Sequence, residues 1–368
     1  MTNKMAARST VDCYSMTSRN PSKLEINVGT IRTIRTQLMK CKQSVVWPSK
    51  LSRTLDAVEM CQACQHKGSA GKYRWTRWQA GDAGSGTGYW PSYNLAPRDV
   101  LPCIVAGRYF NVEEERVLHP MVWGIIPRWV KQGDYREYNI APYNARYEGL
   151  FESKVYSHPL LHGQRCVIVC DGYYEWKTRR QTIKGVKQPF FIYAKQDEGV
   201  KIEDRQTWKA EWSEDDGWKG IKLLKIPGIF DTWLSGEKKI VYSCSMITTN
   251  TEDIPSWLHH RIPMVLESEE EVADWLDYTN VSMNDALEKL HHPAIDSLQW
   301  HRVDPRVNDS RFNNISCYKP IVIEEKKDEA SSSGMVASRL QTGSTSVENK
   351  SEIDAGNDES PTKRLKSG

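Results

Sequence analysis

One uninterrupted apolar run constrains the fold of this chain more than any other feature of its sequence. It extends from Arg165 to Cys170 and consists mainly of small apolar and β-branched residues, the pattern of a buried strand. Asp171-Gly172 then gives a turn or bulge signal, and Tyr173-Tyr174-Glu175-Trp176 follows. A carboxylate between aromatics just past a buried strand is a candidate for a raised pKa and for acid–base chemistry. The alternative is a strand end at which Glu175 is solvated or salt-bridged.

Short strands dominate the rest of the pattern. Runs typical of strands lie at 99–106, 116–124, 188–194, 221–233, 239–249 and 298–303. The helix signals are short, and Ser268-Glu269-Glu270-Glu271 is a capping box at the start of one of them. Many strands with few long helices predict an all-β or α+β fold.

Composition excludes several classes of protein. The 368 residues suffice for one large domain or two ordinary ones. The net charge is only +3, so any nucleic-acid binding has to come from a local basic cleft. No apolar run approaches the length of a membrane span, and the first residues lack the apolar core of a signal peptide, so we expect neither membrane insertion nor secretion. Nine cysteines without framework spacing fit a reducing compartment.

The two ends of the chain differ from its middle. We interpret residues 1–53, which are polar and weakly patterned, as an atypical N-terminal extension that is disordered or stems from a mispredicted exon. Residues 324–368 are rich in Ser, Lys, Glu and Asp and are predicted to form a disordered tail. The basic residues within 361–366 suggest a nuclear location, with the cytoplasm as the alternative. A single domain over 54–323 lies between these ends.

Cys61-Gln62-Ala63-Cys64-Gln65-His66 is the one pattern that suggests a metal. A zinc site would need a second ligand pair at suitable spacing, which the sequence does not offer. We therefore predict no metal and no cofactor, with the thiols packed as small apolar groups of a helix. A zinc-dependent hydrolase built on Cys61, Cys64 and His66 is the alternative.

Three further segments carry chemically informative side chains. Trp123-Gly124-Ile125-Ile126-Pro127-Arg128-Trp129 combines aromatic and basic residues, which are the components of single-strand binding or, alternatively, of a core with a snorkelling arginine. Asn144-Ala145-Arg146-Tyr147-Glu148 would project Asn, Arg and Glu from one face of an extended segment, or form a solvated face. His259-His260-Arg261 is a compact cationic or titratable group.

Taken in order, five segments resemble the SRAP (SOS-response-associated peptidase) family in its eukaryotic, abasic-site-processing form. They are Tyr93–Pro97, Trp123–Trp129, Asn144–Glu148, Cys170–Trp176 and His259–Pro263. The resemblance extends from about Leu55 to Val322. It implies a single α+β domain with a twisted, antiparallel, barrel-like sheet, short flanking helices and a positively charged cleft for single-stranded DNA.

The resemblance also implies a suicide-type reaction in the DNA damage response and DNA repair. An N-terminal cysteine, freed by loss of the initiator Met, attacks the ring-opened aldehyde of an abasic site. Its amine forms a Schiff base and its thiol closes a thiazolidine ring, which gives a covalent protein–DNA crosslink that shields the lesion. The same cysteine removes the initiator Met, hence the peptidase (hydrolase, protease) name. The expected protein is a monomer whose partner is single-stranded DNA with abasic sites.

Catalytic roles follow from the resemblance, motif by motif. Glu175 matches the family's glutamate that shuttles protons between amine and sugar oxygen. His259 matches the histidine that acts as acid in ring opening. Asn144 matches the residue that orients the nucleophile and the sugar.

DNA-binding roles follow in the same way. Arg146 and Arg261 match phosphate-contacting positions, where a guanidinium suits the backbone. Trp129 and Pro127 match the residues that wedge or stack against unpaired bases.

The nucleophile itself is missing from this chain. The family begins Met-Cys-Gly-Arg, whereas position 2 is Thr2 and no Cys-Gly-Arg occurs anywhere. Internal Cys61 and Cys64 have no free α-amine and could at most form a thiohemiacetal, and neither Cys13 nor Cys41, if exposed by cleavage, is followed by Gly-Arg. We favour an active form with a different first exon. A genuine isoform that binds single-stranded or modified DNA without crosslinking is the alternative.

Overall fold

The computed structural model describes residues 50–79, 88–131, 133–138, 142–177, 188–250 and 261–322. The described residues belong to one compact unit, which ends at Val322. Four features named above lie outside the described residues: most of the N-terminal extension, the C-terminal tail with its basic patch, His259 and His260.

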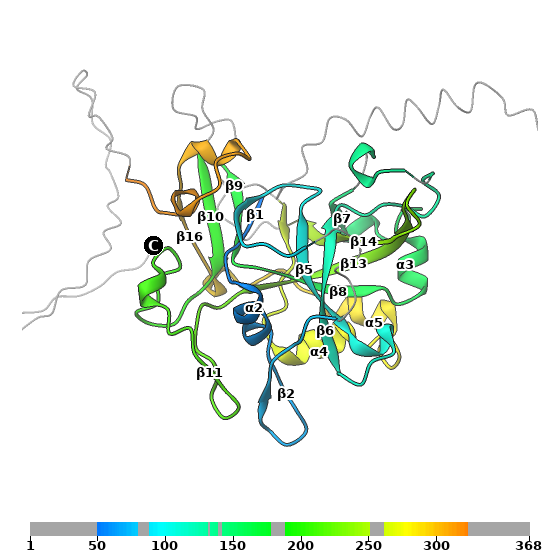
Figure 1. The fold of residues 1–368 in the computed structure, drawn as a ribbon, viewed down its shortest axis with the longest axis horizontal. Helices are drawn as coiled ribbons and strands as arrows, with labels where there is room; N and C mark the ends of the chain where they lie inside the picture. The colour runs from blue at the N-terminus through cyan, green and yellow to red at the C-terminus, as the bar shows by residue number, and fades with distance from the viewer. Residues whose placement is uncertain are drawn as a thin grey trace, which may run out of the picture. The chain divides into compact units, whose positions relative to one another are not determined.

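A closed barrel of five strands organises the described part of the chain (Figure 1). Its strands are β5 (Val100–Ala106), β6 (Arg116–Trp123), β8 (Arg165–Cys170), β13 (Leu224–Leu234) and β14 (Ile240–Asn250). They follow the order β13-β8-β5-β6-β14, and the pairing of β13 with β14 closes the ring. All neighbours are antiparallel except β6 and β14, which are parallel. Two short strands, β7 (Asn144–Arg146) and β15 (Arg261–Pro263), extend the sheet from β14.

A second sheet lies beside the barrel and is antiparallel throughout. Its order is β16 (Leu298–Arg302), β10 (Pro189–Ala194), β9 (Gly172–Trp176), β1 (Leu51–Arg53) and β4 (Ser92–Leu95). Two small hairpins complete the β-structure, β2 (His66–Lys67) with β3 (Tyr73–Arg74) and β11 (Trp212–Ser213) with β12 (Gly217–Trp218). Strand β1 shows that the last residues of the segment that the sequence assigns to the extension, Leu51–Arg53, belong to the second sheet.

One residue connects the two sheets where the apolar run ends. Asp171 separates β8 of the barrel from β9 of the second sheet, as the turn signal predicts. Gly172 is required there, because a Cβ on it would lie 2.4 Å from the carbonyl oxygen of Ile192 in the neighbouring strand. The chain therefore passes from one sheet to the other without leaving the core.

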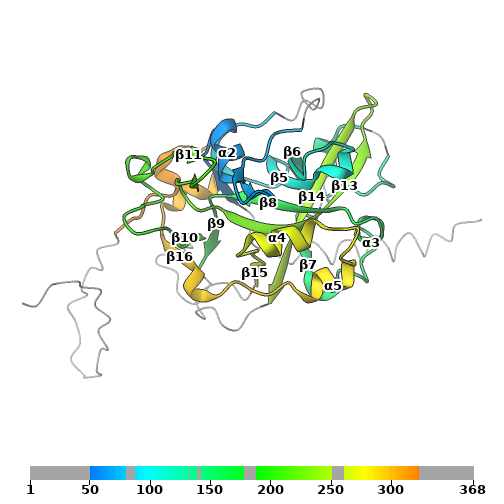
Figure 2. The same cartoon turned by 90° about the horizontal axis from the view of Figure 1, so that it is seen from below.

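Short helices flank the sheets (Figure 2). They are α2 (Ala57–Ala63), α3 (Ser157–Leu161), α4 (Glu269–Leu276) and α5 (Met283–Glu288), together with 3₁₀ turns at Gly107–Phe110, Tyr135–Glu137, Tyr147–Gly149, Arg205–Thr207, Ile295–Ser297, Pro305–Asn308 and Ile315–Cys317. Ser268 caps α4 by accepting a hydrogen bond from the Glu271 N–H, as predicted. No helix in the described part is long and apolar enough to cross a membrane.

The barrel interior continues into the second sheet. One buried cluster takes a side chain from every barrel strand, namely Cys103, Trp123, Cys166, Phe230 and Cys244, and also contains Leu51 and Tyr173 of the second sheet. Because strand side chains alternate between faces, the other face of the barrel packs outward, against α4 among others. The predicted α+β class with a barrel-like sheet and short flanking helices is confirmed.

Candidate active site and nucleic-acid interface

The clearest polar pocket near the predicted site lies where three strands end together. Strand β14 runs between β7 and β15, so that Thr248 pairs with Arg146 on one side and with Pro263 on the other. An open pocket of about 460 Å³ at this point is lined by Arg146, Glu148, Gly149, Asn250 and Arg261. The structure thus brings together the two arginines for which the resemblance implies phosphate contacts.

Arg261 is the buried arginine of this pocket. Its exposed fraction is 4%, and both of its terminal guanidinium nitrogens donate to the Glu148 carboxylate, Nη1 to Oε2 at 3.1 Å. Nη1 also donates to Asn250 Oδ1 at 3.0 Å. Burial acts to raise the pKa of Glu148, but hydrogen bonds from the Asn250 N–H and from Arg261 outweigh it and lower this pKa below its ordinary value. Glu148 is therefore an anion that faces a buried cation.

Arg146 is the exposed arginine of the same pocket. Its side chain has no hydrogen bond or ion pair with another residue in the described ranges. An exposed guanidinium at the rim of a pocket has its full set of donors available for a phosphate.

Asn144 precedes this arginine by two residues on β7 and is 9% exposed. Its carbonyl oxygen accepts a hydrogen bond from the Tyr156 hydroxyl at 3.4 Å. The same hydroxyl contacts Ser245 Oγ at 3.3 Å, and complete burial raises the pKa of Tyr156. These contacts fix the backbone of β7 against β14, and with it the direction in which Asn144 projects.

Glu175 lies on β9 of the second sheet and is 1% exposed. Its Oε1 accepts a hydrogen bond from the Trp176 N–H at 3.2 Å. Side chains two residues apart on a strand share a face, so Glu175 projects on the same side as Tyr173. Tyr173 packs into the buried barrel cluster, which also contains Met246. Met246 pairs with Asn144. Glu175 is thus buried rather than solvated, on the barrel side of its sheet.

Strand β1 lies between β9 and β4 in the second sheet, and the sequence gives no strand signal there. Leu51 pairs with Tyr173 on one side and with Leu95 on the other, and it is fully buried. Arg53 follows two residues later, the spacing of Cys and Arg in Met-Cys-Gly-Arg. By this spacing the position of the expected nucleophile is occupied by Leu51.

A buried polar cluster surrounds β1, and sequence reasoning missed it. Arg53 is 2% exposed, lies 4.4 Å from the Tyr89 ring centre and donates to the Trp90 carbonyl. Asp171 is fully buried and accepts from Ser52 Oγ at 3.3 Å. Burial raises the pKa of Asp171 to about 6. The ionisable side chains of Arg53 and Asp171 are therefore enclosed within the protein.

The tryptophan segment, Trp123–Trp129, continues from β6 into a turn. The Val130 N–H donates to the Pro127 carbonyl at 2.9 Å, Pro127 is buried, and Trp129 is 63% exposed. The Ile126 N–H donates to Ser243 Oγ at 2.9 Å. On β14, Ser243 lies about five residues before Thr248, the residue that pairs with Arg146. Five residues of a strand span roughly 16 Å. Trp129 and Arg146 are therefore separate points on an extended surface.

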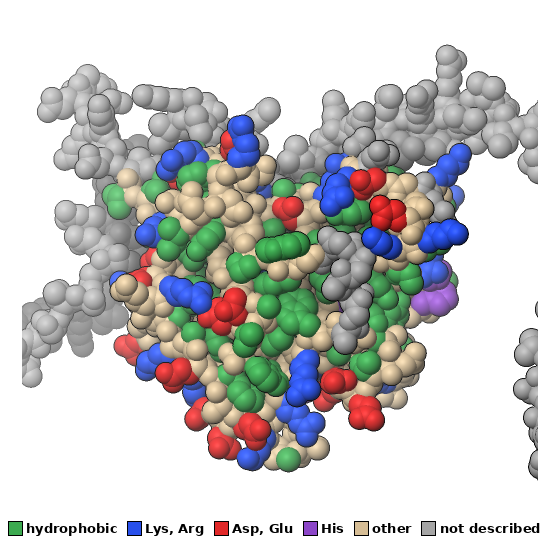
Figure 3. Space-filling model, in the orientation of Figure 1, with side chains coloured by type: hydrophobic (Ala, Val, Ile, Leu, Met, Phe, Trp, Pro, Cys, Tyr) green, Lys and Arg blue, Asp and Glu red, His purple; other side chains and the backbone are tan. Residues whose placement is uncertain are grey.

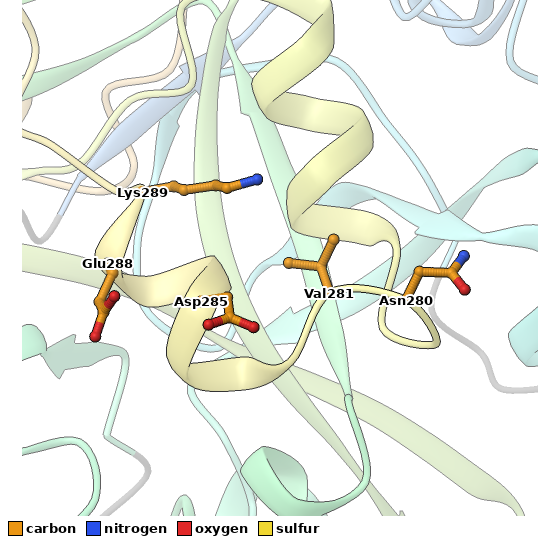
Figure 4. Close-up of a pocket in the computed structure, with 5 residues that line it drawn as sticks. All are labelled: Asn280, Val281, Asp285, Glu288 and Lys289. Carbon is orange, nitrogen blue, oxygen red and sulfur yellow. The ribbon is translucent and has the colours of Figure 1, made fainter.

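Other pockets on the described surface lie apart from the predicted site residues. One of about 530 Å³ is lined by Arg74, Arg77, Arg116, Trp75 and Trp212, among others. Figure 3 shows Lys and Arg interspersed with Asp and Glu on the face in view, without one large basic patch. A pocket of about 550 Å³ lined by Asn280, Val281, Asp285, Glu288 and Lys289 lies beside α5 (Figure 4). None of the predicted site residues lines the pocket beside α5 or the pocket of about 530 Å³.

The thiols of the CxxC pattern are packed in the core. Cys61 and Cys64 are buried, and burial raises the pKa of Cys61 to about 11. His66 lies 3.8 Å from Glu115. Within the described ranges no group of three or more His, Cys, Asp or Glu side chains could hold a metal. Buried, protonated thiols are poor nucleophiles.

Comparisons with known proteins place this geometry in a family. The family model of the SOS response associated peptidases (SRAP) matches residues 59–310. A protein of Xenopus tropicalis described as abasic site processing protein HMCES is 35% identical over 283 residues, which cover 75% of this chain and 79% of that protein. The Bacillus subtilis abasic site processing protein YoqW is 28% identical over 227 residues, which cover 61% of this chain and 84% of its own length.

A solved structure agrees on the fold. A protein of Bacteroides thetaiotaomicron superposes with a TM-score of 0.51 at 20% identity, over 70% of this chain and 93% of that one. At this identity the likeness concerns the fold alone. The match to the family model and the identity to the Xenopus protein together show that the chain belongs to the SOS response associated peptidase (SRAP) family.

Proposed function

We propose that this protein recognises abasic sites in single-stranded DNA, and that a form whose β1 begins with cysteine in place of Leu51 crosslinks to them. The relatives' names support abasic-site processing. The observation that carries the finer proposal is the position of β1, which places residue 51 beside Tyr173, two residues from the buried Glu175.

The proposed condensation needs three kinds of group. The α-amine of an N-terminal cysteine adds to the C1′ aldehyde of the opened sugar and water leaves, which gives a Schiff base. The thiol sulfur then adds to the same carbon, and its proton goes to the nitrogen, which closes the thiazolidine. Glu175, enclosed by aromatic neighbours, would carry protons between amine and sugar oxygen. Asn144 would orient the reacting groups, and His259, outside the described residues, stays a prediction as the acid of ring opening.

Binding precedes this chemistry and uses separate residues. Arg146 offers an exposed guanidinium to a phosphate, and Trp129 offers an exposed ring to an unpaired base. The chain as printed has an internal Leu51, which supplies neither thiol nor free amine. For this chain we therefore propose binding without crosslinking, which was the alternative left open by the sequence.

A denaturing gel with abasic single-stranded oligonucleotide tests the proposal. The printed chain is compared with a version in which Met-Cys replaces residues 1–51, so that cysteine directly precedes Ser52. We expect a slow band, stable without borohydride, for the Met-Cys version and none for the printed chain or for a Met-Ser control. A folded Met-Cys version that gives no band would refute the crosslinking proposal. Equal affinity of the printed chain for abasic and undamaged strands would refute lesion recognition.

A further inference from the structure

Two histidines lie one helical turn apart on α3, the helix that packs beside barrel strand β13 (Figure 1). His158 is the second residue of α3, and His162 follows its last residue. Their rings are stacked, with centres 3.9 Å apart and planes inclined by 12°. Residues four apart on a helix share a face, and two histidines at this spacing bind zinc in metalloproteases. The pair is therefore a candidate metal chelate.

Hydrogen bonds assign the proton on each of these two rings. His158 Nδ1 lies 3.1 Å from Gln164 Oε1, and His162 Nδ1 lies 2.8 Å from the carbonyl oxygen of His158. Both oxygens only accept hydrogen bonds, so each neutral ring carries its proton on Nδ1. The lone pair of each Nε2 is then available to a metal, while the other ring nitrogen is held by a protein oxygen, as in most metal-binding histidines.

The groups behind His158 are themselves fixed. Gln164 is 2% exposed, and its Nε2 donates to the Tyr109 hydroxyl at 3.1 Å, which sets the orientation of its amide. Asp231 Oδ1 lies 3.8 Å from His158 Nδ1 and accepts from Arg128 Nε at 2.7 Å. Because the charges of Arg128 and Asp231 balance each other, this neighbouring pair does not repel a cation bound at the histidines.

Exposure and spacing leave room for an ion between the rings. His162 is exposed, and the side chain of His158 is 34% exposed. Two nitrogens bound to one Zn²⁺ lie at most about 4.2 Å apart, twice the Zn–N distance, so a turn of the exposed His162 ring suffices for a shared ion. Among the described residues no third His, Cys, Asp or Glu completes a set of three ligands. Water would take the remaining positions, which makes the site an open one.

We propose that His158 and His162 form a binding site for a divalent transition metal such as Zn²⁺, held through the two Nε2 atoms. Imidazole suits Zn²⁺, Ni²⁺ and Cu²⁺, whereas Mg²⁺ prefers oxygen ligands. The site is independent of the abasic-site chemistry, because neither histidine belongs to the predicted catalytic or DNA-binding residues.

Calorimetric titration of the untagged, full-length chain with Zn²⁺ tests the site. Q164M removes the acceptor behind His158 and should weaken Zn²⁺ binding by about 10–100-fold, the usual cost of losing an outer partner of a ligand. H158Q and H162Q each remove one of two ligands and should weaken it at least as much. Mg²⁺ should give no binding heat. Thermal unfolding without metal checks folding, and H162Q, a change at an exposed position, should keep the wild-type Tm.

The double variant H291Q/H292Q is the matched control. His291 and His292 are exposed and follow α5, so their replacement also removes two surface imidazoles. It should leave the affinity for Zn²⁺ unchanged, and a loss equal to that of H162Q would show unspecific binding to histidines and overturn the assignment. Wild-type affinity in folded H162Q would overturn it as well, and so would a wild-type chain that binds no Zn²⁺.

Discussion

Two regions of this protein use arginine and acidic side chains in opposite ways. Around β1, Arg53 and Asp171 are enclosed in the second sheet, with 2% and 0% exposure. At the barrel edge, Arg146 is exposed beside an open pocket. Strand β1 is paired on both sides, with β4 and with β9, whereas β7 pairs with β14 alone. The comparison teaches that residue type alone does not decide whether a charge stabilises the fold or faces a ligand, because neighbouring side chains enclose Arg53 and leave Arg146 exposed.

Arginine replacement is the largest test of this comparison. R53A should lower the free energy of unfolding by about 3 kcal/mol, because it removes the buried guanidinium and its stacking on Tyr89 and leaves the Trp90 carbonyl without its donor. R146A, the matched change at an exposed position, should cost less than about 0.5 kcal/mol. Urea unfolding measures both. An equal loss of unfolding free energy in R53A and R146A would show that the two regions do not differ in this way.

The pH dependence of stability sharpens the same contrast. The pKa of Asp171 is about 6 in the folded protein, against about 3.9 in an unfolded chain. Between these values the folded state binds more protons, so the contribution of Asp171 to stability falls as pH rises from about 4 to about 6 and is constant above.

The variant D171N does not titrate at this position. The free energy of unfolding of D171N minus that of the wild type should therefore grow by about 2–3 kcal/mol across this window. Other carboxylates titrate in both proteins and cancel in the difference. Denaturant unfolding at a series of pH values gives the curve, and a difference that stays flat from pH 4 to 6 would show that Asp171 is not held in an apolar environment.

A last comparison lies within one segment, which contains a buried and an exposed tryptophan. Trp123 is fully buried in the barrel, whereas Trp129 is 63% exposed. W129A should weaken single-strand binding by about 1–2 kcal/mol through loss of base stacking, with stability nearly unchanged. W123A should instead lower stability by about 3–5 kcal/mol. Fluorescence anisotropy and thermal unfolding on both variants separate the two losses, and unchanged binding by W129A would remove Trp129 from the interface.

Local patterns in the sequence predicted all five barrel strands and, in the second sheet, β10 and β16. The runs at 99–106, 116–124 and 239–249 become β5, β6 and β14 with bounds within one residue, because a buried apolar run and its breaking residues are local signals. The N-cap at Ser268 was readable for the same reason, although the Glu271 carboxylate accepts from the Glu267 N–H and not from the Ser268 N–H that a capping box requires. Pattern alone could not show that residues 51–53 form a strand, since three residues give no periodicity.

The sequence by itself determined the five barrel strands, the break at Asp171-Gly172 and, through its motifs, the family. Tertiary structure alone decided that the strands form a closed barrel and a second sheet, that Leu51 lies beside the strand of Glu175, and that Arg261 pairs with Glu148, 113 residues away. The physical reason is that burial and charge pairing depend on contacts between residues far apart in the chain. A motif names the arginines and carboxylates, and the packed structure determines which of them face solvent.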